Sequence, residues 1–187
     1  AAWGNNASGQ CDILAPPAGF AHVEVAARGF LLLNNVSIFS GLTLVRLASA
    51  RSYVPFGPGC AGSLGASRLI PIALPGLGGR FEIAVDKLPL GVALLATGAS
   101  RSASAFGPLP IDLGLYGLPG CFLRVAPDLL TVVGSGAGTR AAFSASVPAD
   151  TALLGARFYQ QALVPDPAAG NGAGVVVSEA AAGLVGD

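Results

Sequence analysis

The most regular stretch of this sequence is Phe81-Glu82-Ile83-Ala84-Val85-Asp86. Successive side chains of a β-strand point to opposite faces, so this order places Phe81, Ile83 and Val85 on one face and Glu82 and Asp86 on the other. One apolar face and one charged face are typical of a strand that is buried on one side only. The stretch therefore predicts a half-buried strand.

Short apolar runs recur on both sides of this stretch, from Tyr53 to the end of the chain. Gly, Pro, Asp or Asn bounds each run, and these residue types favour turns. The further strands expected are 91–97, 121–125, 129–133, 140–147, 156–164 and 174–180. This pattern predicts an all-β fold, an antiparallel β-sandwich of about seven or eight strands. One helical turn is expected at 148–155, where Asp150 caps the amides and Gly155 supplies a left-handed exit.

Composition excludes several classes of protein. The 187 residues include 27 Gly and 14 Pro, too many helix breakers for a helical bundle. Ten basic residues balance ten acidic ones, so no net field attracts a phosphate backbone, and sequence-independent nucleic-acid binding is excluded. A membrane-spanning helix needs about 20 mostly apolar residues. The longest uncharged stretch, 29–45, is interrupted by Asn, Ser and Gly, so no membrane span is expected.

Residues 1–50 differ in composition from the remainder and contain the only Trp and the only His of the chain. The segments 3–10 (WGNNASGQ) and 20–27 (FAHVEVAA) resemble one propeller repeat of the regulator-of-chromosome-condensation type. A propeller needs several blades, and this chain has a single Trp-Gly motif. We therefore expect a strand-rich, propeller-repeat-like N-terminal extension over 1–50, followed by a β-sandwich domain over 51–187.

A second resemblance covers about 53–186. Its landmarks, in order, are 56–63 (FGPGCAGS), 120–121 (GC), 148–155 (PADTALLG) and 158–162 (FYQQA). Together they resemble an uncharacterised β-sandwich module found at the C-terminal end of large secreted proteins of planctomycetes and related bacteria. The resemblance implies an extracellular, non-catalytic module. Cys60 and Cys121 are landmarks of it, each follows a Gly, and we expect a disulfide between them. Cys11 is then left as a buried free thiol, a reactive thiol or an intermolecular bridge.

Candidate catalytic and metal-binding residues are few. His22 is the only histidine, it alternates with Glu24 as a strand-surface pair would, and no Gly-x-Ser-x-Gly elbow supplies a nucleophile. Glu82 and Asp86 share a face but resemble the solvated side of an amphipathic strand. The loop 166–171 offers oxygen atoms without the regular ligand spacing of a calcium site. The sequence therefore predicts no enzyme activity, no cofactor and no metal site.

Two functions fit these observations. The first is an extracellular or cell-surface structural subunit that self-assembles into a homo-oligomer, filament or surface layer, because a chain with only 11% charged residues has apolar surface to cover. Part of 29–45 would add a strand to a neighbour's sheet edge. The residues expected to do so are Phe30, Leu31, Leu32, Leu33, Val36, Ile38, Leu42 and Leu44. The alternative is a C-terminal binding or sorting module of a larger secreted protein, recognising carbohydrate or the cell envelope.

Overall fold

The computed structural model describes residues 20–27, 31–33, 36–38, 43–49, 51–135 and 138–187. The chain divides into two compact units, Ala1–Ala50 and Arg51–Asp187. In the first unit β1 (Phe20–Ala27) pairs antiparallel with β4 (Thr43–Ser49). A second ladder joins β2 (Leu31–Leu33) to β3 (Val36–Ile38), also antiparallel. Each ladder has two strands among the described residues.

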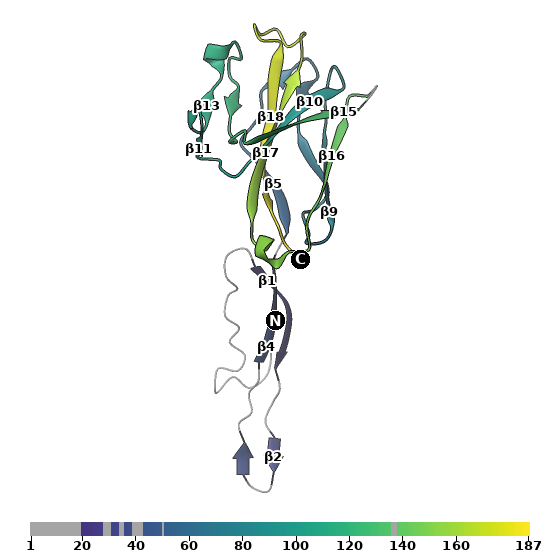
Figure 1. Cartoon of the computed structure of the whole chain (residues 1–187), viewed down its shortest axis with the longest axis vertical. Coiled ribbons are helices and arrows are strands. Elements are labelled where there is room, and N and C mark those ends of the chain that lie inside the picture. The colour runs from purple at the N-terminus through teal and green to yellow at the C-terminus, as the bar shows by residue number, and fades with distance from the viewer. Residues whose placement is uncertain (1–19, 28–30, 34–35, 39–42, 50, 136–137) are drawn as a thin grey trace. The chain divides into compact units, whose positions relative to one another are not determined.

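The second unit contains a five-stranded and a three-stranded antiparallel sheet (Figure 1). The order in the larger sheet is β15-β10-β17-β18-β5, and in the smaller one β16-β9-β8. The larger sheet comprises β5 (Ser52–Phe56), β10 (Val92–Gly98), β15 (Leu129–Gly134), β17 (Arg157–Pro165) and β18 (Val175–Leu184). The smaller comprises β8 (Leu69–Ala73), β9 (Arg80–Val85) and β16 (Ala141–Ser146).

The core lies between these two sheets. Its buried residues come from every strand of both: Tyr53, Leu69, Phe81, Ile83, Val85, Ala93, Leu95, Val133, Ala141, Ala162, Val164, Val176 and Ala181. Aromatic rings fill one end of it, because the Phe81 ring lies 5.3 Å from that of Tyr53 and 5.2 Å from that of Phe158. Two sheets that share one apolar layer form a sandwich, so the predicted all-β fold is confirmed.

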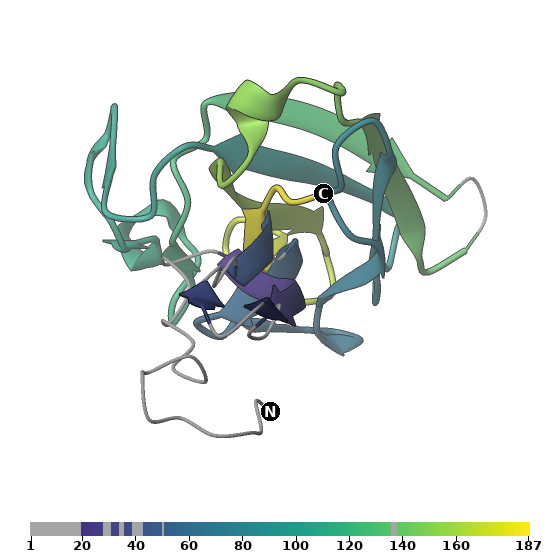
Figure 2. The same ribbon diagram turned by 90° about the horizontal axis from the view of Figure 1, so that it is seen from below.

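The opposite face of the larger sheet is covered in part by an insertion between β10 and β15. It contains β11 (Ala103–Ser104), β12 (Gly107–Pro108), β13 (Ile111–Asp112), the short 3-10 helix η1 (Gly114–Tyr116) and β14 (Phe122–Leu123). Figures 1 and 2 show the insertion on one side of β17 and β18, with β9 and β16 on the other. Leu118 and Cys121 of the insertion form a small buried cluster with Val177 of β18.

Two consecutive glutamines of β17 make hydrogen bonds on opposite faces of the larger sheet, because neighbouring side chains of a strand point to opposite faces. On the core side, Gln160 Oε1 accepts a 2.9 Å hydrogen bond from Tyr53 Oη. On the outer side, Gln161 Nε2 donates to the Phe122 carbonyl at 3.0 Å, and its Oε1 accepts from the Arg124 amide at 2.8 Å. The second glutamine therefore ties the insertion to the sheet.

The sequence-based elements agree with the structure in most places. Phe81, Ile83 and Val85 are at most 3% exposed, as the alternation predicts. The expected turn at 148–155 contains the 3-10 helix η2 (Thr151–Leu153), where Asp150 Oδ1 accepts from the Ala152 amide and Gly155 has φ +78°. The expected strand 121–125 is the exception: β14 has two residues, which pair with β13, while Cys121 is bound through the disulfide and the Arg124 amide donates to Gln161.

Remaining short elements connect these parts. β6 (Ala61–Gly62) and β7 (Gly65–Ala66) form a two-residue ladder that leads into β8. No helix among the described residues has the length and the apolar character needed to cross a membrane.

Candidate functional site

The predicted disulfide between Cys60 and Cys121 is present, with the two Cα atoms 5.1 Å apart. Cys60 reaches this position because the chain before it passes directly over β18: its amide donates to the Val177 carbonyl at 3.0 Å. At Gly59 a side chain would collide with the backbone of Ser178, so the close approach requires glycine. The bond joins the start of the sandwich to the end of the insertion.

The expected assembly segment lies in the first unit. Leu31, Leu32 and Leu33 form β2, Val36 and Ile38 lie in β3, and Leu44 lies in β4. Phe30 and Leu42 lie outside the described residues, as does Cys11. His22 and Glu24 are in β1, on either side of a register shift in its pairing with β4.

The other candidate residues from the sequence have structural partners. Asp86 pairs with Arg68 and Glu82 with Arg80, at 3.3 and 3.1 Å. Asp166 is buried, and its carboxylate accepts from the Ser63 amide at 2.6 Å, the Ser63 hydroxyl at 2.8 Å and the Ala168 amide at 3.2 Å. The Asp166 carboxylate therefore holds its loop against the turn that follows β6, and Asn171 Oδ1 accepts from the Gly174 amide within the loop. No group of three His, Cys, Asp or Glu residues suited to a metal occurs among the described residues.

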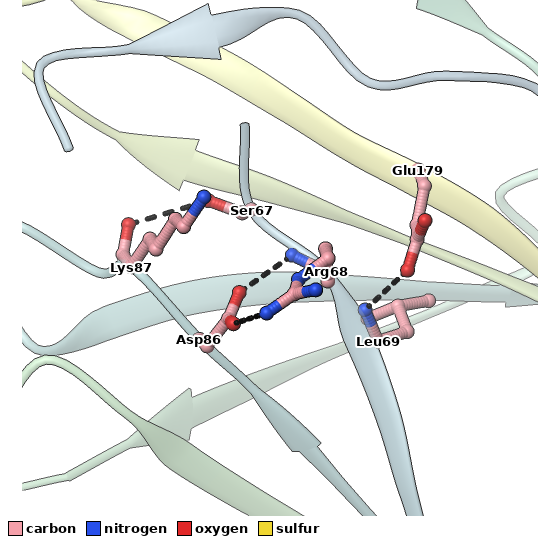
Figure 3. A network of polar contacts seen from close by, with 6 residues as sticks. All are labelled: Ser67, Arg68, Leu69, Asp86, Lys87 and Glu179. Atoms are coloured by element: carbon pink, nitrogen blue, oxygen red, sulfur yellow. Dashed lines mark hydrogen bonds and ion pairs between the residues drawn. The ribbon is translucent and has the colours of Figure 1, made fainter. Parts of the chain in front are cut away.

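A polar cluster joins the two sheets at one corner of the sandwich (Figure 3). Asp86 accepts from the Arg68 amide at 2.8 Å, and Glu179 of β18 accepts from the Leu69 amide at 3.3 Å. The Ser67 hydroxyl donates to the Lys87 carbonyl at 3.3 Å. Every contact here satisfies a backbone group or a counter-charge within the fold, so the cluster fixes β8 against β18.

Burial raises the pKa of Tyr53 above the usual tyrosine value, with a smaller contribution from the Glu179 carboxylate. Its hydroxyl lies in the core and donates to Gln160. This shift belongs to a structural core residue, since the hydroxyl faces the sandwich interior.

The first surface with functional character is the edge strand β15. It pairs with β10 and with no other strand among the described residues. Leu129, Leu130 and Val132 are 59%, 51% and 70% exposed, and the strand contains neither a charged residue nor a proline. The other edges differ: β5 contains Pro55, β8 contains Pro71, and the exposed face of β16 carries serines.

The second surface lies on the outer face of the same sheet, at its opposite edge. A shallow hollow of about 160 Å³ lies there over β5, β17 and β18. Its lining residues are Ser52, Val54, Arg101, Arg157, Tyr159, Ala182, Gly183 and Leu184. Sequence reasoning missed this surface, because its residues come from four separate segments and no local motif unites them.

Comparison with protein-family models, with curated proteins and with solved structures found no match to this chain.

Proposed function

We propose that the protein is a non-catalytic, extracellular structural subunit that self-assembles into filaments or a surface layer. In this assembly the N-terminal segment of one copy adds a strand to the β15 edge of the next copy. The observation that carries the proposal is the exposed, uncharged and proline-free edge of β15.

An unpaired edge strand presents a row of free N–H and C=O groups that can pair with another chain. Monomeric proteins usually protect such edges with charges, prolines or bulges. β5 and β8 each contain a proline, whereas Leu129, Leu130 and Val132 of β15 offer apolar side chains beside the open ladder. An incoming strand would satisfy the backbone groups and cover these side chains together.

The N-terminal unit supplies a suitable donor. β2 and β3 hold only apolar residues and one serine, and they pair in a ladder of two strands. A two-stranded ladder is marginally stable by itself and leaves an edge of each strand open. Addition to a larger sheet would extend this ladder.

The extracellular location is supported by the disulfide between Cys60 and Cys121, because disulfides persist mainly in oxidising compartments. The resemblance to modules of large secreted bacterial proteins also supports an extracellular location. The same fold also suits the alternative, a binding or sorting module at the C-terminal end of a larger secreted protein.

The test is to measure the particle size of three variants by sedimentation and electron microscopy at high concentration. Val132→Lys puts a charge beside the β15 edge, and deletion of residues 1–50 removes the donor. Ile72→Lys is the matched control, because Ile72 is 55% exposed on the edge strand of the other sheet. We expect the first two to be monomers and the control to assemble as the wild type does.

Two results would refute the proposal. One is a wild-type chain that stays monomeric at high concentration, which favours the attached-module alternative. The other is normal assembly of residues 51–187 alone, which would show that the donor lies elsewhere.

A further inference from the structure

The hollow on the outer face owes its shape to the register of three strands. Tyr159 of β17 lies opposite Ala182 of β18, and Ala182 lies opposite Val54 of β5. Side chains at these positions point away from the core, because their neighbours Phe158 and Tyr53 point into it. The small Ala182 therefore forms the floor between two larger side chains.

Aromatic rings close one side of this floor. The Phe56 ring meets the Tyr159 ring edge to face, with centroids 5.9 Å apart, although β5 and β17 are separated by β18. Strands two positions apart are roughly 9.5 Å from each other, so the rings reach across Ala180 and Ala182 because alanines leave the space free. The result is a rigid apolar wall beside a shallow depression.

Two arginines carry the only charges that line the hollow among the described residues. The Arg101 guanidinium carbon lies 5.6 Å from the Phe56 ring centroid, a cation–π contact that leaves its N–H groups available. Within the described part of the chain, Arg157 has no carboxylate partner, in contrast to Arg68 and Arg80. A guanidinium presents a planar fork of donors that matches a carboxylate or a sulfate.

The second depression of the sandwich unit has a different lining. It measures about 290 Å³ and is lined by Arg51 and Arg80, but Arg80 is paired with Glu82 and no aromatic residue lines this depression in the described structure. The hollow over Ala182 thus combines an aromatic wall, a small apolar floor and two arginines with no carboxylate partner among the described residues.

We propose that this hollow binds one acidic sugar residue of an extracellular glycan. The carboxylate or sulfate of the sugar accepts hydrogen bonds from Arg101 and Arg157, and the apolar face of the ring packs on Ala182 and Tyr159. A volume of about 160 Å³ holds one ring and leaves the rest of the glycan in solvent. The site is independent of the assembly edge, because β5 and β15 are opposite edges of the sheet.

The test is calorimetric titration of the full chain with a uronic-acid oligosaccharide, a sulfated oligosaccharide, a neutral oligosaccharide and inorganic sulfate. We expect the two acidic oligosaccharides to bind and the neutral one not to bind. Arg101→Ala and Arg157→Ala should each weaken binding about tenfold, which is the usual effect of losing one charge-assisted contact. Arg140→Ala is the matched control, since Arg140 is exposed next to β16 of the other sheet, and should bind like the wild type.

Ala182→Leu tests the shape of the hollow without changing its charge. It fills the floor of the hollow, leaves both arginines in place and lies on a solvent-facing side of the sheet, so the fold should keep its melting temperature. We expect it to weaken binding of both acidic oligosaccharides as strongly as the arginine variants do. Binding of the neutral oligosaccharide with equal affinity, binding of inorganic sulfate as tight as that of the oligosaccharides, or an equal loss in Arg140→Ala would each overturn the proposal.

Discussion

Replacing Cys60 and Cys121 by serine should lower the stability of the sandwich unit by about 4 kcal/mol. The bond closes a loop across a sequence separation of 61. The chain-entropy relation assigns about 4 kcal/mol at 25 °C to a loop of this length. For a domain of this size, 1 kcal/mol corresponds to a shift of roughly 3–4 °C in Tm, so the double variant should melt about 15 °C lower.

Differential scanning calorimetry of the wild type, the double variant and the wild type with a reductant measures this effect. Reduction should reproduce the double variant. Cys11→Ser is the control and should retain the reductant-sensitive melting transition, because it leaves the Cys60–Cys121 pair intact. A Tm difference under about 4 °C, or titration of three free thiols in the unfolded, unreduced protein, would refute the reasoning.

Further predictions concern buried groups. Gly183→Ala should destabilise the unit by about 2 kcal/mol, because the new methyl group would collide with the Phe158 ring. Gly172→Ala is the control and should be neutral, because the space around Gly172 is open. Urea titration compares the stability of the two variants. Asp166→Ala should cost about 2 kcal/mol in the same assay, since it removes the buried carboxylate that accepts from the Ser63 and Ala168 amides. The pKa of Tyr53 is raised in the folded protein, so the unfolded chain loses the hydroxyl proton at a lower pH than the folded one. The free energy of unfolding should therefore fall above about pH 10, by up to about 1.4 kcal/mol per pH unit. This fall should be absent in Tyr53→Phe.

The strands that the sequence predicts well are those with a complete local signal. β9 alternates apolar and charged residues because one face packs in the core, and the turn over 148–155 contains both its cap and its terminating glycine. β5 and β8 carry Pro55 and Pro71, and a proline inside a run counts against a strand. Both strands exist because they lie at sheet edges, where one side needs no ladder partner.

The disulfide and the hollow on the outer face were less predictable from the sequence than the strands. The Cys60–Cys121 pair followed from a resemblance, since spacing alone does not fix a disulfide partner. Arg101 and Tyr159 line the hollow and both contact Phe56 beside it, and these contacts depend on the strand order β17-β18-β5. That order is a property of the whole sheet, so no window of sequence contains it.

The position of the disulfide also bears on how the protein withstands proteases. Phe106, Leu115 and Tyr116 are 75%, 96% and 69% exposed, and all three lie inside the loop that the Cys60–Cys121 bond closes. These are the most exposed leucine and aromatic residues in the described part of the chain, so a protease that cuts after such residues would cut this unit there first. Each cut would leave two fragments joined through sulfur, with β10 and β15 still paired in one sheet. The nicked unit would run as one band without reductant and as two with it, while its core remains folded.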